Sequence, residues 1–175
     1  LGMLDPARIY PFYEVATQAE WGETPLEGQQ RSAELWADYG RCFYSRHDYE
    51  DIETDKANAV MQGIKAELAN LPGQTVEGLA IVSADEFAYD DPVDGSHSAA
   101  QGLRIGFAGG GRAVFRLSGT GTVGATIRVY LERLETDQSL VNTPTDAALS
   151  QITRAAMAVS DLHSLTGRTA PNVIT

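Results

Sequence analysis

Cysteine and long apolar runs are the features that this sequence most clearly lacks. Cys42 is the only cysteine, which excludes an intramolecular disulfide and a thiolate metal cluster and is compatible with a reducing compartment. No apolar run approaches the ~18 residues of a membrane-spanning helix, so we expect no membrane span. The three histidines, His47, His97 and His163, stand far apart without the spacing of metal ligands. We therefore expect no metal site, and no serine can be assigned a catalytic base.

Positive charge is also scarce, because 13 Lys and Arg stand against 24 Asp and Glu, for a formal net charge of −11. Binding to nucleic acid needs a basic face, so nucleic acid is not an expected partner. No acidic residue lies between Asp94 and Glu132, and this window holds all of Arg104, Arg112, Arg116 and Arg128. A locally positive site on a negative protein favours a small anionic ligand. The alternative is that these arginines only cover solvated strand faces.

Within this window, residues 116–128 read RLSGTGTVGATIR, a Gly, Ser and Thr loop between two arginines. Glycine lets backbone N–H groups turn toward an anion and approach it closely. Ser118, Thr120 and Thr122 add hydroxyl donors, and Arg116 and Arg128 can add forked, charge-assisted hydrogen bonds. The pattern therefore predicts a cradle for a phosphate group.

Two other motifs in the sequence do not lead to a site. Residues 119–124 match G-x-G-x-x-G, but a dinucleotide fold needs a helix directly afterwards, and the residues that follow alternate with the period of a strand. A G-K-[ST] ending is absent, which excludes a P-loop. Residues 90–96 are similar to the start of an EF-hand, but Pro92 stands at the third ligand position, so we expect a turn between strands.

Hydrophobic periodicity predicts an α+β fold. Helices are expected over residues 26–39 and 55–71, and a third begins at Thr143 as cap with Pro144 in its first turn and ends at Gly167. Strands are expected over residues 42–49, 79–83, 87–89, 103–107, 113–117 and 127–132, followed by an extended segment over 168–175. This order predicts an antiparallel β-sheet with helices packed on one face, plus an irregular N-terminal arm.

Several blocks from about Trp36 onward resemble, in order, the C-terminal (fourth) domain of phosphoglucomutases, in the α-D-phosphohexomutase superfamily. The blocks are YGR at 39–41, FYSRHDYE at 43–50, DDPVDGS at 90–96, QGLR at 101–104, VFRLSGTG at 114–121, GATIR at 124–128 and TGRTAP at 166–171. The resemblance implies a phosphate-binding domain over residues 34–175, with residues 1–33 as an arm or linker.

The resemblance also implies a function. The complete family enzyme interconverts glucose 1-phosphate and glucose 6-phosphate with Mg²⁺ and glucose 1,6-bisphosphate, and its fourth domain clamps the phosphate that does not react. The residues that would bind this phosphate are Arg116, Ser118, Gly119, Thr120 and Arg128, with Arg46 nearby. No catalytic residue, metal ligand or cofactor is implied in this chain itself. The expected ligands are glucose phosphates or inorganic phosphate.

The sequence departs from the family in ways that leave two functions open. It contains no phosphoserine loop, no metal-binding aspartate loop and no sugar-reading loop of the family, so we do not expect this chain alone to catalyse the mutase reaction. Residues 1–33 do not resemble the segment that precedes this domain in the family. The chain is then either the phosphate-clamping domain of a mutase or a derived domain that serves as a structural or interaction subunit.

The N-terminal arm suggests how the chain could contact a partner, and the resemblance and the first residue suggest its location. It either packs on its own domain or docks on another subunit, which would be the remaining mutase domains or another protein. The family resemblance implies the cytoplasm. Because the first residue is Leu1 and not Met, an organelle is the alternative, if a presequence has been removed.

Overall fold

The computed structural model describes the backbone of residues 25–121 and 124–175, and the side chains of 32–119 and 124–175. The irregular segment expected before residue 25 lies outside the described residues. The chain divides into two units, Leu1–Tyr39 and Gly40–Thr175. In the first unit, helix α2 spans Pro25–Tyr39, which confirms the helix expected over 26–39. The boundary expected between residues 33 and 34 stays a prediction.

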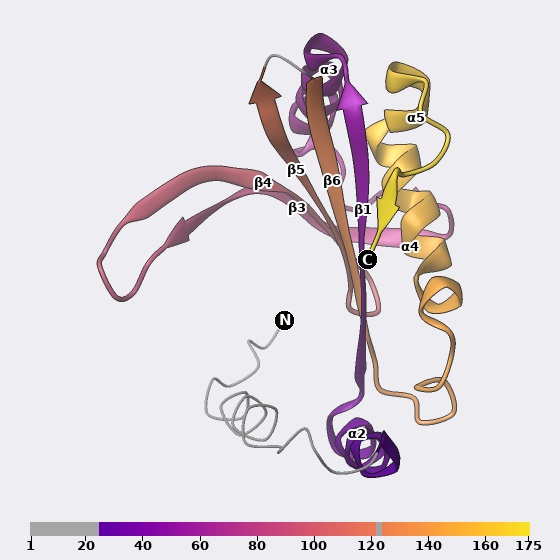
Figure 1. The fold of residues 1–175 in the computed structure, drawn as a ribbon. Coiled ribbons are helices and arrows are strands. Elements are labelled where there is room, and N and C mark those ends of the chain that lie inside the picture. Colours follow the sequence, from indigo (N-terminus) through magenta and orange to yellow (C-terminus); the bar gives the residue numbers. More distant parts are fainter. Residues whose placement is uncertain (1–24, 122–123) are drawn as a thin grey trace. The chain divides into compact units, whose positions relative to one another are not determined.

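The second unit is built on a seven-stranded sheet in which every pairing is antiparallel, in the order β2-β3-β4-β5-β6-β1-β7 (Figure 1). The strands are β1 Arg41–Ile52, β2 Thr75–Val76, β3 Leu79–Asp90, β4 His97–Phe107, β5 Gly111–Gly121, β6 Gly124–Glu135 and β7 Val173–Ile174. The two outermost strands, β2 and β7, are two residues long. The α+β fold with an antiparallel sheet is thereby confirmed.

Three helices cover one face of this sheet: α3 Thr54–Glu67, α4 Thr145–Ser160 and α5 Leu162–Thr166 (Figure 1). Their apolar residues recur at helical spacing, such as Val60 and Ile64 of α3, and meet every second residue of the strands. Phe115, Ile127 and Val129 are completely buried there. The intervening residues of the same strands point to the opposite face, where the charged side chains lie.

Strands β3 and β4 continue past the sheet as a curved two-stranded arm (Figure 1). The two short strands expected over 79–83 and 87–89 are therefore one strand of 12 residues. The register shifts between Phe87 and Tyr89, opposite Ala100, whose φ of 52° is left-handed. A bulge of this kind bends the bulged strand and increases its twist, which accounts for the curvature of the arm.

The structure corrects the ends of two predicted helices. Helix α4 begins at Thr145, with Pro144 and not Thr143 in the capping position, because extended Pro144 offers its carbonyl to the Ala148 amide at 2.9 Å. It ends at Asp161 in the left-handed conformation, which separates α4 from α5 before Gly167. The helix predicted over 55–71 ends at Glu67. None of the described helices combines the length and apolar character needed to span a membrane.

Candidate functional site

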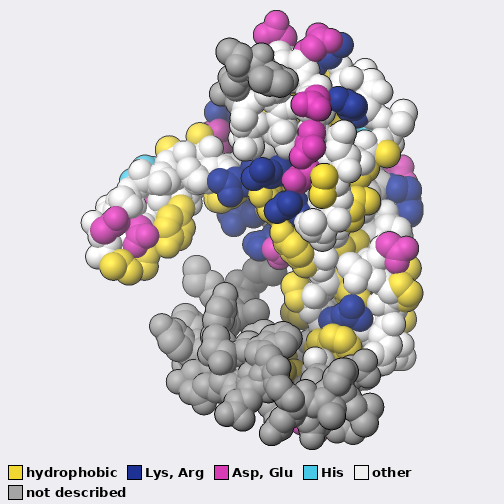
Figure 2. Space-filling view, viewed as in Figure 1, with side chains coloured by type: hydrophobic (Ala, Val, Ile, Leu, Met, Phe, Trp, Pro, Cys, Tyr) yellow, Lys and Arg dark blue, Asp and Glu magenta, His cyan; other side chains and the backbone are white. Residues whose placement is uncertain are grey.

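The face of the sheet opposite α3, α4 and α5 carries five arginines, and we call it the arginine face. They are Arg46 of β1, Arg104 of β4, Arg112 and Arg116 of β5, and Arg128 of β6. They share this face because residues two apart on a strand point the same way and cross-strand partners stand side by side. Figure 2 shows Lys and Arg side chains concentrated beside the base of the β3–β4 arm.

The row of the arginine face nearest the 118–124 loop places two positive charges directly opposite each other. Arg116 of β5 pairs with Arg128 of β6, and Arg128 pairs in turn with Asp48 of β1. One step closer to the loop, Ser118 pairs with Thr126 on the same face. The predicted Arg116, Ser118 and Arg128 therefore lie side by side on two neighbouring strands.

The Arg116–Arg128 pair is only weakly neutralised. Cross-strand partners have Cβ atoms about 4.5–5.5 Å apart, and like charges at that position destabilise a sheet. Among the described residues, no carboxylate lies within ion-pair distance of Arg116, whose Nη2 donates to Oε1 of Gln101 at 3.2 Å. Arg128 makes a long contact, 3.7 Å from its Nε to Oδ2 of Asp48. An anion between the two guanidinium groups would remove this repulsion.

Asp48 is the buried counter-charge of the arginine face. Its side chain is 5% exposed, and its Oδ1 lies 3.0 Å from Nε of Arg46. Arg46 is therefore paired with an acid two residues away on the same strand. The Nε atoms of Arg46 and Arg128 and Oδ1 of Asp48 are buried without an aligned hydrogen bond. The attraction is therefore mainly electrostatic, and the guanidinium groups keep hydrogen-bonding capacity for another acceptor.

Arg104 and Arg112, the other two arginines between Asp94 and Glu132, form ion pairs with acidic side chains. Arg104 binds Asp85 through two hydrogen bonds, of 3.0 Å from Nε and 2.6 Å from Nη2. The Nη2 atom of Arg112 donates to Oε1 of Glu132 at 2.6 Å. The alternative considered for all four arginines, that they cover a strand face, therefore fits Arg104 and Arg112.

Gly119, in the described part of the 118–124 loop, has the openness that an anion cradle needs. Gly119 has a φ of 69°, and a Cβ added there would meet nothing within 4 Å. The pairing of β5 with β6 shifts register between Ser118 and Gly121. The side chains of Thr120 and Thr122 lie outside the described residues, so their predicted roles stay predictions.

Two titratable side chains of β1, His47 and Cys42, add no charge to the site at pH 7. Burial lowers the pKa of His47, against a smaller opposing effect of Asp48, from an ordinary value of about 6.5. Burial and, to a smaller degree, Glu132 raise the pKa of Cys42, against a lowering effect of Arg112. His47 is therefore an uncharged imidazole and Cys42 a thiol, and the positive charge of the face comes from its arginines.

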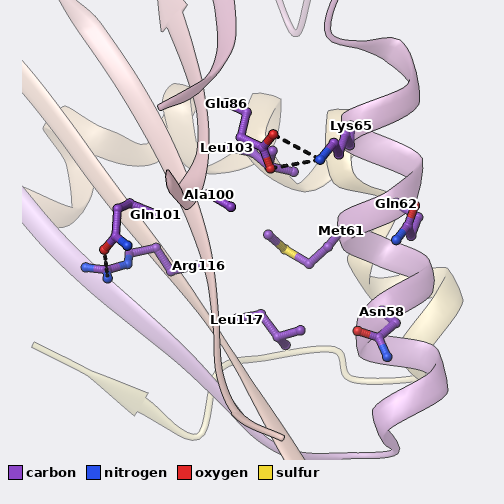
Figure 3. A pocket seen from close by; sticks show the side chains of 11 residues that line it. Asn58, Met61, Gln62, Lys65, Glu86, Ala100, Gln101, Leu103, Arg116 and Leu117 are labelled. Carbon is purple, nitrogen blue, oxygen red and sulfur yellow. Dashed lines mark hydrogen bonds and ion pairs between the residues drawn. The ribbon is translucent and has the colours of Figure 1, made fainter. Parts of the chain in front are cut away.

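A groove of about 400 Å³ lies between α3 and strands β3, β4 and β5, beside Arg116 (Figure 3). Met61 of α3 points across it, and Gln101 stands with Arg116 at one edge. The lysine in its lining, Lys65, pairs with Glu86 at 2.9 Å. Because that charge is already compensated, the groove adds no second anion site to the arginine face.

The described residues do not form a metal site. Over 32–119 and 124–175, no three His, Cys, Asp or Glu side chains are grouped as a metal ion requires. The Mg²⁺ that the family resemblance implies for the complete enzyme therefore has no fitting site among these residues.

The sequence does not single out two residues of the site, Asp48 and Gln101. The spacing Arg46-x-Asp48 on a strand does signal that both side chains share a face. The approach of Asp48 to Arg128, and of Gln101 to Arg116, depends on strand register, which the sequence pattern does not reveal.

Comparison with known proteins gives a consistent family. The family described as phosphoglucomutase-1, C-terminal domain, matches residues 41–172. A phosphoglucomutase of Rhizobium radiobacter is 47% identical over 140 residues, which cover 80% of this chain and 26% of that protein. A probable cytoplasmic phosphoglucomutase of Arabidopsis thaliana is 45% identical over 147 residues, which cover 80% of this chain and 25% of that protein.

A solved structure agrees with these relatives. The exocytosis-sensitive phosphoprotein pp63/parafusin of Paramecium, a phosphoglucomutase solved in an open form, has a TM-score of 0.75 and 38% identity with this chain. The match covers 92% of this chain and 27% of that one. The chain thus spans about a quarter of the length of these proteins.

Proposed function

The chain belongs to the phosphoglucomutase family as its C-terminal domain, and we propose that its arginine face and 118–124 loop bind the phosphate of a glucose phosphate. Arg116 and Arg128 hold the phosphate oxygens, and Ser118 and the backbone amides from Gly119 onward add hydrogen bonds. Thr120 adds its hydroxyl, and Arg46 contributes charge from the neighbouring row. In the complete enzyme, this domain would clamp the phosphate that is not transferred between positions 1 and 6 of glucose.

One observation carries this proposal: Arg116 and Arg128 oppose each other across β5 and β6. A purely structural sheet gains nothing from two like charges at one cross-strand position, and cation pairs there cost stability. The arrangement becomes favourable when a dianion lies between the two guanidinium groups. Ser118 and the open Gly119 stand where that dianion would need further donors.

The domain would act by positioning and not by chemistry of its own. Phosphoryl transfer is catalysed by several parts that hold the reacting groups in line and stabilise charge together. A fixed guanidinium pair supplies one of these parts, because it anchors one end of the substrate. The family uses Mg²⁺ and glucose bisphosphate, and the group that exchanges phosphate would come from the remainder of the enzyme.

Calorimetric titration of the 175-residue chain with glucose 6-phosphate and with inorganic phosphate tests the proposal. Arg116→Ala and Arg128→Ala should each weaken binding roughly tenfold or more, since each removes a charge-assisted interaction of about 1.5–3 kcal/mol. Arg112→Ala is the matched control: it removes the same charge from the same face, but this arginine is held by Glu132. Binding that is unchanged in both test variants, or reduced equally in the control, would refute the clamp.

A further inference from the structure

Gly124, the last residue of the 118–124 loop, lies against an irregular part of strand β1, and the C-terminal segment holds that part. We propose that Arg168 and Asn172 are positioning residues for the phosphate loop, because they fix the bulge of β1 against which Gly124 packs. The inference rests on the proposed function of the loop. It concerns residues that do not themselves contact the phosphate.

Strand β1 bulges next to the loop. Its register with β6 passes from the pair Tyr49–Ile127 to the pair Ile52–Ala125, so that two residues of β1 stand opposite one residue of β6. Asp51, in this bulge, has a φ of 53°, which residues other than glycine adopt infrequently. A bulge leaves backbone groups without ladder partners, and these groups need other hydrogen bonds.

The C-terminal segment supplies those hydrogen bonds. Nη2 of Arg168 donates to the carbonyl oxygens of Glu50, at 2.8 Å, and of Asp51, at 3.0 Å. Oδ1 of Asn172 accepts the Glu50 amide at 2.9 Å, and the Asn172 amide donates to the carbonyl of Asp48 at 2.8 Å. One guanidinium and one amide side chain therefore hold the amide and the carbonyl of Glu50 and the carbonyl of Asp51.

The bulge touches the loop at Gly124. Gly124 has a φ of 121°, and a Cβ built on it would lie 3.3 Å from Cα of Asp51 and 3.4 Å from the carbonyl oxygen of Ile52. It pairs with Gly121 at the end of the β5–β6 ladder. A shift of the bulge would therefore move the base of the loop, and with it the amides that follow Ser118.

The start of the C-terminal segment fixes where Arg168 lies. Helix α5 ends at Gly167, whose left-handed φ of 73° turns the chain and whose amide donates to the carbonyl of His163. The Arg168 amide donates to Oγ1 of Thr166 at 3.2 Å. Arg168 thus follows the hydrogen-bonded C-terminal end of α5, and this position places its guanidinium group at the bulge of β1.

Two measurements on the 175-residue chain test this inference. In Arg168→Ala we expect the affinity for inorganic phosphate to fall on the order of tenfold, because small displacements of binding groups are costly. Arg168→Lys should restore part of it, since an ammonium can still donate to the two carbonyls. In the same variants without phosphate, the backbone amide chemical shifts of Gly121 and Gly124 should move in Arg168→Ala and less in Arg168→Lys.

Arg133→Ala is the matched control, because Arg133 is a partly buried arginine, paired with Glu135 at 2.8 Å, near the far end of β6. It should leave phosphate affinity and the Gly121 and Gly124 shifts unchanged. Unchanged loop shifts in a folded Arg168→Ala protein would overturn the inference. If Arg168→Ala does not fold, Asn172→Ala replaces it with the same expectations, because it removes a single side-chain hydrogen bond.

The two proposals can fail separately. A wild-type chain that binds no phosphate would refute the proposed function, and the amide shifts without phosphate would still decide whether Arg168 positions the loop. Phosphate binding that depends on Arg116 but is unaffected by Arg168→Ala would uphold the proposed function and overturn this inference.

Discussion

Asp48 places a buried carboxylate between Arg46 and Arg128, on the face that we propose receives an anion. A carboxylate with little exposure to water is costly unless cations compensate it, and here two guanidinium groups do so. The carboxylate also stands in for part of the negative charge that a ligand would bring. These contacts hold Arg46 and Arg128 in position without a bound ligand.

We expect Asp48→Asn to lower the free energy of unfolding by roughly 1–3 kcal/mol, because it leaves two guanidinium groups without their counter-charge. Inorganic phosphate should then raise the melting temperature of the variant more than that of the wild type, since it replaces the missing anion. Differential scanning calorimetry with and without phosphate measures both effects.

Glu77→Gln is the control for this variant. It removes the same charge and an ion pair to Arg154, at 3.4 Å, that lies outside the arginine face. Phosphate should raise its melting temperature as much as that of the wild type. An equal phosphate response in Asp48→Asn and Glu77→Gln would contradict the role given to Asp48.

At the scale of single residues, the sequence pattern predicts the arginines of the site better than their partners. Arg116 and Arg128 can be identified from the sequence because they flank a loop of Gly, Ser and Thr residues, and this pattern lies within one short segment. The direct opposition of these two arginines and their contacts with Gln101 and Asp48 follow from strand register. Register depends on the packing of the whole sheet, so no local pattern reveals it.

At the scale of elements, alternation predicts the strands well where one face is apolar. Residues 127–132 alternate between buried and charged or aromatic side chains and lie within β6 as expected. Strand β3 is predicted as two pieces because Asp85 and Glu86 interrupt its apolar pattern. In the fold these acids pair with Arg104 and Lys65, so the strand continues through them.

Helix α4 packs closely against strand β5 of the sheet through Ile152. Ile152 is 3% exposed, and a Cβ added to Gly111 of β5 would lie 2.6 Å from its Cδ1. We expect Ile152→Ala to lower the free energy of unfolding by about 2–5 kcal/mol, because it leaves a cavity between helix and sheet. Urea denaturation measures this loss, and phosphate affinity of the folded protein should remain unchanged.

Ser150→Ala, on the exposed side of the same helix, is the comparison for this substitution. Its hydroxyl donates to the carbonyl of Ala147, and we expect its removal to change stability by less than about 0.5 kcal/mol. Similar losses from the two substitutions would contradict the packing described for α4.

At the scale of the whole molecule, the chain corresponds to the C-terminal domain of phosphoglucomutases, about a quarter of their length. It carries a net charge of −11, and among the described arginines of the arginine face Arg116 has no carboxylate within ion-pair distance and Arg128 has only a long contact with Asp48. This distribution favours recognition of a small anion, and in our proposal the steps of phosphoryl transfer belong to other groups of the complete enzyme.

We therefore expect the 175-residue chain to bind glucose 6-phosphate without interconverting glucose phosphates. An assay that couples glucose 6-phosphate formation to NADPH production, with glucose 1-phosphate, glucose 1,6-bisphosphate and Mg²⁺, should give no rate above the protein-free background. A full-length phosphoglucomutase serves as the positive control. A rate that Arg116→Ala abolishes would show that the chain catalyses the reaction by itself.

The C-terminal residues that hold the β1 bulge also occupy the outer edge of that strand. The amide of Arg46 donates to the carbonyl of Thr175 at 2.7 Å, and the amide of Thr175 donates back to the carbonyl of Arg46 at 3.0 Å. A long strand with a free edge can recruit a strand of another molecule and begin aggregation. By pairing along this edge, two residues of β7 and their neighbours protect β1 from edge-to-edge association between copies of the protein.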